Sequence, residues 1–153
     1  MDQVDERLSM WRESLCQKVD VGGLISRNSI VHKWKAPFRS LVLRETLLWR
    51  FVDLLMQAKL LLDNHHHLGK QILIRSALET VAVLIYLNYK TKEVLLGNYS
   101  FHEFSELTSK ILLGSKDGST QLTNVNILTI LQKADKKYPK LFKEPLNKPP
   151  KLP

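Results

Sequence analysis

The feature that most constrains the fold is the stretch from Gln71 to Leu87, the most apolar of the chain, in which 12 of 17 residues are apolar. Placed at about 100° per residue, as on an α-helix, these side chains cover the whole circumference. A helix that is apolar all round is buried all round. In a chain of 153 residues, such a helix belongs at the centre of a bundle. We therefore expect a central helix over residues 68–89.

Two charged residues, Arg75 and Glu79, interrupt this stretch. A helix that crosses a bilayer needs roughly 20 uninterrupted apolar residues, and a charge inside it is costly. The sequence therefore predicts a core helix with no membrane contact.

Two features near the N-terminus indicate the cellular location. Residues 1–6 are acidic, whereas a secretory signal has basic residues followed by an apolar run. Cys16 is the single cysteine, so an intramolecular disulfide is impossible and a reducing compartment is favoured. We expect a cytoplasmic protein.

Helical periodicity, capping residues and breakers predict further helices around the central one. Pro37 suits the first turn of a long helix, the pair Ser100 and Glu103 has the spacing of a capping box, and Pro139 ends the last helix. The predicted helices cover residues 3–19, 37–64, 100–113 and 124–138, with a short extra turn at 92–97 and a polar, basic connector at 24–36.

The predicted fold class is therefore all-α, a bundle of four to five helices around the buried central helix. We expect one domain over residues 1–138. Residues 139–153 contain five prolines and four lysines, a composition that forbids a helix and favours an extended tail.

Arg75 and Glu79 are the first candidate site. Four residues apart, they share a helical face with Ile72, Val83 and Tyr86, so both charges are expected among apolar neighbours. Buried charges persist when they are paired and hydrogen-bonded. The sequence favours an internal ion pair that clamps the helix. The alternatives are a cleft in which Arg75 faces a phosphate or a carboxylate, and a peripheral location of the pair.

Three adjacent histidines and the cysteine are weaker candidates. Side chains at His65, His66 and His67 diverge on a turn, and no Cys-x-x-Cys or His-Glu-x-x-His motif accompanies them. We expect a polar turn that faces water, with neither metal nor cofactor. Cys16 lies within the predicted first helix without a histidine at a related spacing, which indicates a packed or half-exposed thiol.

The formal net charge of +8 favours an anionic partner, such as RNA or an acidic protein surface. Basic residues with interleaved aromatic residues bind single strands by phosphate contact and stacking. The candidate nucleic-acid contacts are Lys133, Lys136, Lys137, Lys140 and Lys143. The alternative for this cluster is a solvated basic surface without a partner.

From Gly69 to Leu87 the chain resembles the central helix of a bacterial helical family of unknown function. In that family an Arg-Ser-x-x-Glu signature is followed by aliphatic residues and a Tyr-Leu pair. The matching positions here are Arg75, Ser76, Glu79, Tyr86 and Leu87. The segment 123–139 is also similar to that family, and the resemblance spans about residues 40–150.

That family in turn resembles the HEPN helical bundles, many of which are ribonucleases of toxin and defence systems. The resemblance implies a helical bundle that contacts RNA. It also implies a further helix with a Ser-Glu and a His-Pro-Asn element, which the sequence does not reach by Pro153. Either the natural chain continues past Pro153 or the protein lacks this motif, and a lone Arg75 without a general base is not an active site.

Two hypotheses for function follow. The first is an HEPN-like module that binds RNA, or cleaves it in a complete form. The second is a helical interaction module without chemistry, of which a two-fold homodimer is the simplest case. The sequence contains no complete catalytic set, so both enzymatic and non-enzymatic roles stay open.

Overall fold

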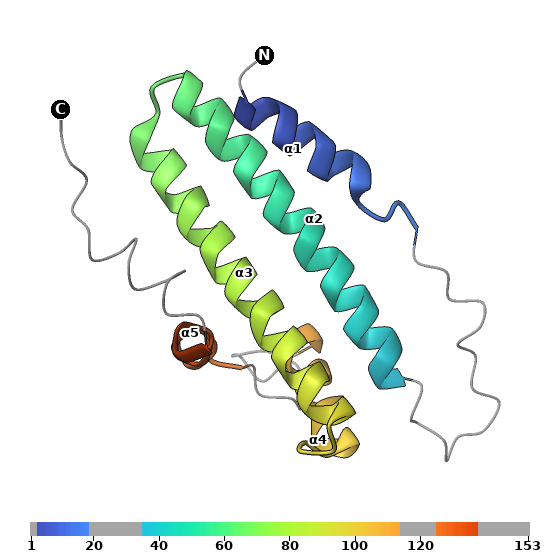
Figure 1. The fold of residues 1–153 in the computed structure, drawn as a ribbon. Coiled ribbons are helices and arrows are strands. Elements are labelled where there is room, and N and C mark those ends of the chain that lie inside the picture. Colours follow the sequence, from blue (N-terminus) through green and yellow to red (C-terminus); the bar gives the residue numbers. More distant parts are fainter. Residues whose placement is uncertain (1–2, 19–34, 114–124, 138–153) are drawn as a thin grey trace.

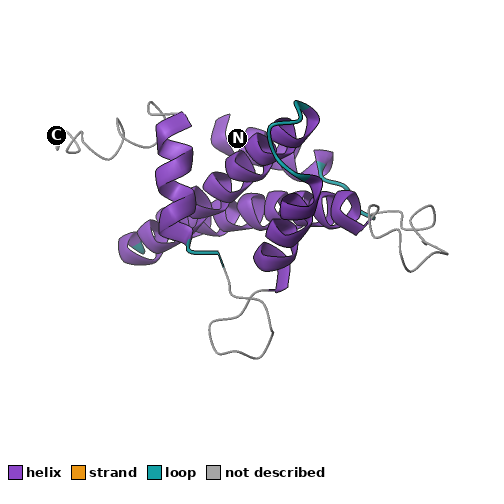
Figure 2. Cartoon of the chain, turned by 90° about the horizontal axis from the view of Figure 1, so that it is seen from below, coloured by secondary structure: helices purple, strands orange, loops and turns teal. Residues whose placement is uncertain are grey.

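A computed structural model of the chain describes residues 3–18, 35–113 and 125–137. Its five helices are α1 (Gln3–Ser14), α2 (Lys35–Asp63), α3 (His67–Leu95), α4 (Phe101–Leu113) and α5 (Ile127–Lys137). Within these ranges there is no strand (Figure 2). The predicted all-α bundle is confirmed.

Two long antiparallel helices, α2 and α3, form the body of the bundle (Figure 1). The short helix α1 packs against α2, so that α2 lies between α1 and α3. On the other side, α5 packs against α3, and α4 contacts both long helices. One cluster of buried residues joins α3 to α4 and α5, and a second joins α2 to α3 and α4.

The long helix α2 follows its prediction closely. Pro37 lies in its first turn, where the amide that proline lacks has no helical partner. Leu43 and Val52 are buried, while Arg50 and Asp53 are exposed. The helix ends at Asp63, and His65 adopts a left-handed φ of 58° in the turn that leads to α3.

Helix α3 is longer than predicted. The extra turn expected at 92–97 is wrong, because α3 continues without a break to Leu95. No breaker precedes Gly97, whose φ of 76° takes the chain out of the helix. The amide of Leu96 still bonds the carbonyl of Lys92 at 3.0 Å.

Helix α1 is shorter than predicted. It ends at Ser14, not at residue 19, and the Ser14 hydroxyl donates to the Trp11 carbonyl at 2.7 Å. Cys16 therefore lies outside the helix, which corrects its predicted place. It is exposed, and its thiol donates to the Lys18 carbonyl at 3.1 Å.

Side-chain caps fix the starts of α4 and α5. The Ser100 hydroxyl accepts from the His102 amide at 3.2 Å, and the Glu103 carboxylate accepts from the Ser100 amide at 3.3 Å, which confirms the capping box. The Asn126 side chain accepts from the Leu128 amide at 2.9 Å, so α5 begins at Ile127, later than predicted.

Burial of the central helix differs between its two halves. Ala82, Tyr86 and Leu87 are buried, whereas Leu68 is 73% and Ile72 57% exposed. The expectation of a helix buried all round is therefore wrong for its N-terminal half. Among the described residues, α3 is the one helix long and apolar enough to span a membrane, with 33% of its apolar window buried. A helix at the centre of a bundle meets the same criterion.

Several predictions concern residues outside the described ranges. They are the part of the predicted connector at 24–34, the predicted tail 139–153, and the candidate contacts Lys140 and Lys143. Lys137 ends α5, and its side chain is outside the description.

Candidate nucleic-acid interface

A groove between α3 and α5 brings together aromatic and basic side chains. It encloses about 400 Å³. We name it the Tyr–Lys groove after the residues that define it: Tyr86, Tyr89, Lys90, Lys133 and Lys136. Lys133 and Lys136 were predicted as nucleic-acid contacts, and the fold places them beside three residues of α3.

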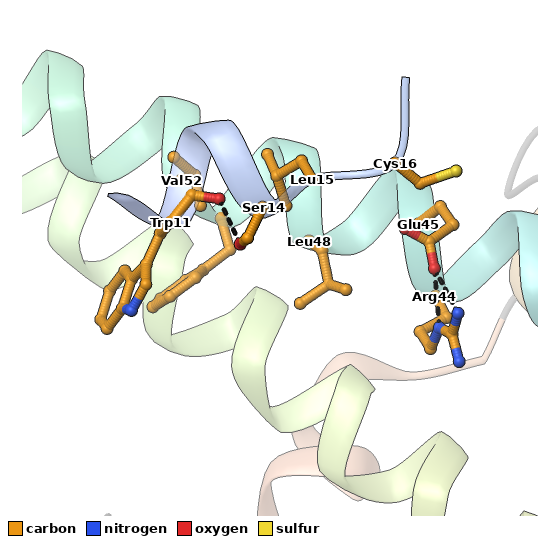
Figure 3. A pocket seen from close by; sticks show the side chains of 9 residues that line it. Trp11, Ser14, Leu15, Cys16, Arg44, Glu45, Leu48 and Val52 are labelled. Carbon is orange, nitrogen blue, oxygen red and sulfur yellow. Dashed lines mark hydrogen bonds and ion pairs between the residues drawn. The ribbon is translucent and has the colours of Figure 1, made fainter. Parts of the chain in front are cut away.

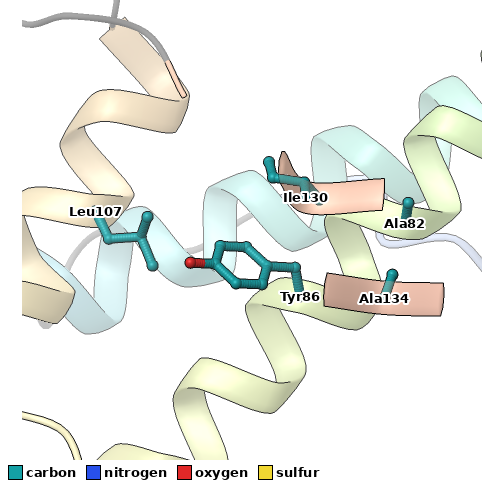
Figure 4. Packing of buried hydrophobic residues seen from close by; sticks show 5 residues of the cluster. All are labelled: Ala82, Tyr86, Leu107, Ile130 and Ala134. Atoms are coloured by element: carbon teal, nitrogen blue, oxygen red, sulfur yellow. The ribbon is translucent and has the colours of Figure 1, made fainter. Parts of the chain in front are cut away.

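Close packing of two helices sets the floor of this groove. Ala82 on α3 and Ala134 on α5 are almost fully buried, and such small side chains let the helices approach. Between them Tyr86 is buried beside Ile130, with its hydroxyl directed toward Leu107 of α4 (Figure 4). The Tyr86 ring is therefore a fixed part of the core, from which the groove opens outward.

The lysines of α5 are held over this floor. Lys133 has its Nζ atom 5.3 Å from the centroid of the Tyr86 ring, and the ammonium group donates to the Tyr86 hydroxyl at 3.5 Å. This cation–π geometry favours a fixed position for the charge. Lys136 follows three residues later, so the two lysines share one face of α5.

Lys90 supplies a third cation from the opposite wall. Its Nζ atom lies 3.7 Å from the centroid of the Tyr99 ring and 5.8 Å from that of Tyr89. Burial raises the pKa of the Tyr99 phenol above its ordinary value, with smaller contributions from Tyr86 and nearby carboxylates. Tyr99 therefore stays neutral at physiological pH and presents a ring, not a charge, to Lys90.

The chemistry of the groove suits a polyanion with flat bases. The described residues that line it include three lysines and no carboxylate. Ammonium groups neutralise phosphates and release counterions. The ring of Tyr89 is half-buried at the rim, where a base can stack on a tyrosine face.

The structure pairs Arg75 with Glu79 but does not bury them. Arg75 Nε lies 3.2 Å from Glu79 Oε1, and the Arg75 side chain is 81% exposed. The predicted burial of this pair is wrong, because α5 covers the same helical face only around Ala82 and Tyr86. Arg75 lies about 16 Å from Tyr86 along α3, at 1.5 Å per residue, and does not line the Tyr–Lys groove.

The histidine turn lies at the other end of α3. His65, His66 and His67 are all exposed. The rings of His65 and His67 have centroids 6.5 Å apart. No group of three metal-ligating side chains occurs within the ranges that the structure describes.

Two groove residues, Tyr89 and Lys90, escaped the sequence analysis. The central helix was predicted to end at residue 89, which placed Lys90 outside it. The signal was present in the spacing, because Lys90 follows Tyr86 by four residues and so shares its helical face. The contribution of α5 to the same groove is a tertiary contact that spacing along the chain does not contain.

Comparison of the chain with protein-family models, with curated proteins and with solved structures finds no match. The function therefore has to be argued from the chain's own residues.

Proposed function

We propose that the protein binds single-stranded RNA in the Tyr–Lys groove. The observation that supports this most is the convergence of Lys90, Lys133 and Lys136 from two helices on one groove beside Tyr89. Such a groove combines phosphate contact with a stacking surface, the two elements that sequence-tolerant single-strand binding requires.

The charge of the whole chain acts in the same direction. A formal net charge of +8 attracts a polyanion over distances of the order of the Debye length, about 8 Å at physiological ionic strength. RNA is preferred as the polyanion because the run from Gly69 to Leu87 resembles a bacterial helical family that in turn resembles the HEPN bundles. Single-stranded DNA has the same phosphates and bases and is the competitor to test.

The proposal is for binding and includes no cleavage step. Arg75, the arginine of the Arg-Ser-x-x-Glu signature, lies on the open surface beside Glu79. General acid–base catalysis needs a second group within hydrogen-bond reach of the reacting atoms.

The test is a titration of the full chain with a fluorescently labelled single-stranded RNA, followed by anisotropy. We expect the double variant Lys133→Glu/Lys136→Glu to bind at least about tenfold more weakly than the wild type, because two phosphate contacts become repulsive. Tyr89→Ala should lose about 1–3 kcal/mol of binding energy through stacking.

The control variant is Lys18→Glu/Lys70→Glu, which changes the net charge equally at two lysines that do not line the groove. It should bind RNA within about threefold of the wild type at physiological salt, since distant charges are screened. Equal losses in both double variants would show that only the overall charge matters and would contradict the proposed site.

A further inference from the structure

A long apolar groove runs along the face of α2 between α1 and α3. It consists of three adjoining hollows of about 290, 480 and 700 Å³. Trp11 lines the first two, and Arg44 and Leu48 line the second and third. These shared residues join the hollows into one surface feature, which we call the α2 groove.

The floor of the α2 groove has the residue spacing of a helix–helix seam. The residues of the floor follow one another at alternating intervals of three and four along α2. Arg44 is one member of this series, and the other members are apolar. They are Leu41, Leu48, Phe51, Leu55, Ala58 and Leu62. A seam with this repeat normally packs against another helix. It spans about 30 Å at 1.5 Å per residue.

The walls of the groove are also apolar and partly open to solvent. From α1, Trp11 packs beside Phe51 with ring centroids 6.0 Å apart. Figure 3 shows Trp11 and Leu48 among the residues that line the middle hollow. From α3, Ile74 lines the first hollow, and Leu78 lies one turn further along the same face; both are exposed.

Charge identifies the kind of helix that fits. Arg7 and Lys70 line the first hollow, and Arg44 lines the other two. Among the described lining residues the carboxylate is Glu45, which is buried and accepts from Arg44 at 2.8 Å. Lys59 is paired with Asp63 at 2.6 Å. Arg7 and Lys70 therefore make the rim positive at the first hollow.

We propose that the α2 groove is the docking site for an acidic amphipathic helix of a partner protein. The apolar stripe of that helix packs on α2, as in helix-in-groove recognition, and its carboxylates meet Arg7 and Lys70. A second copy of this chain fits less well, because each copy carries a formal net charge of +8 and the two repel.

The experiment uses the full chain and a synthetic helical peptide of roughly 21 residues, about 30 Å long. The peptide has leucines at heptad positions a and d, glutamates at the flanking positions and a neutral dye. A twin peptide has lysine in place of every glutamate. Anisotropy titrations should give an affinity for the acidic peptide at least about tenfold above that for its twin.

Two matched variants locate the binding surface. Leu62→Glu changes a leucine that lines the groove, and Leu60→Glu changes a leucine two residues away in α2 that does not. Leu60 is 62% and Leu62 40% exposed, so both variants are expected to fold, which circular dichroism checks. Leu62→Glu should weaken binding of the acidic peptide about tenfold or more, and Leu60→Glu less than about threefold.

Three results would overturn the proposal. The first is that the acidic peptide does not bind, which is the result expected if a segment of the chain itself fills the groove. Another is an equal loss in Leu60→Glu and Leu62→Glu. The third is sedimentation of the wild-type chain as a dimer that Leu62→Glu separates, because a second copy would then be the occupant. None of these results depends on RNA binding, since the variants lie outside the Tyr–Lys groove.

Discussion

The two halves of α3 have similar apolar sequences and different surroundings. In the C-terminal half, Ala82 and Tyr86 are buried under α5, and Leu87 packs against Phe104 of α4. In the N-terminal half, Leu68 and Ile72 project from the same helix into solvent. The apolar character of a helix thus permits burial, but the neighbours that reach it decide where burial occurs.

The difference follows from the lengths of the helices. With 29 residues, α3 is about 43 Å long, whereas α5 has 11 residues and is about 16 Å long. In Figure 1 α5 is seen nearly end-on beside α3, so it crosses the long helix and does not run along it. A crossing helix covers a few turns only. Beyond those turns the same face of α3 stays open.

The largest expected effect comes from truncating a core residue on the covered half. Tyr86→Ala removes a buried ring that packs against α5, and should lower the free energy of unfolding by about 3–5 kcal/mol. Ile72→Ala, on the open half, should change it by about 0.5 kcal/mol or less. Urea denaturation monitored by circular dichroism measures both. Similar losses would remove the distinction between the halves.

Next in size is the effect of two glycines, one in the first turn of α3 and one just beyond its C-terminal end. Gly97→Ala should cost about 1 kcal/mol or more, because its φ of 76° is unfavourable for a residue with a side chain. Gly69→Ala lies in the first turn of the open half and should stabilise by roughly 0.5 kcal/mol through helix propensity. Its new methyl group meets the Leu61 Cδ1 atom at 2.9 Å, and that flexible end can move. Destabilisation by Gly69→Ala would show that the α2–α3 contact is tighter there.

The capping box of α4, which helps to cover the C-terminal half, should contribute about as much. Ser100→Ala removes the acceptor for the His102 amide and should cost about 1 kcal/mol. Ser14→Ala is the comparison at a helix C-terminus, because the Ser14 hydroxyl donates to the Trp11 carbonyl and caps no helix amide in that bond; it should cost less than Ser100→Ala. Thermal unfolding of both variants checks the difference, and an unchanged melting temperature for Ser100→Ala would argue against a structural role for the cap.

The smallest expected effect is at Arg75. An exposed ion pair contributes about 0.5 kcal/mol or less, so Arg75→Ala should leave the denaturation midpoint nearly unchanged. A buried pair broken on one side would cost about 3–5 kcal/mol. A loss of that size would restore the internal clamp that the sequence first suggested.

The sequence predicted the fold class and most of the helices, because their periodicity and caps are local. Pro37, Ser100 and Glu103 each act within one turn of a helix, and each prediction was confirmed. The end of α1 and the open face of α3 were predicted incorrectly, since both depend on contacts between distant segments. Just beyond α1 the Trp49 indole donates to the Cys16 carbonyl at 2.9 Å, and the open face of α3 depends on where α5 packs. Lys133 and Lys136 were identified by composition, but their position beside Lys90 required the packing of α5 on α3.

The most direct test of the account is the salt dependence of RNA binding. For single strands, each phosphate contact contributes about 0.7 to the slope of the logarithm of affinity against the logarithm of salt concentration. Lys133→Ala/Lys136→Ala should therefore reduce the slope by about 1.4 relative to the wild type, and Lys18→Ala/Lys70→Ala should leave it unchanged. If Lys133→Ala/Lys136→Ala has the same slope as the wild type, or if the wild type binds no RNA at low salt, the Tyr–Lys groove is not an RNA-binding site.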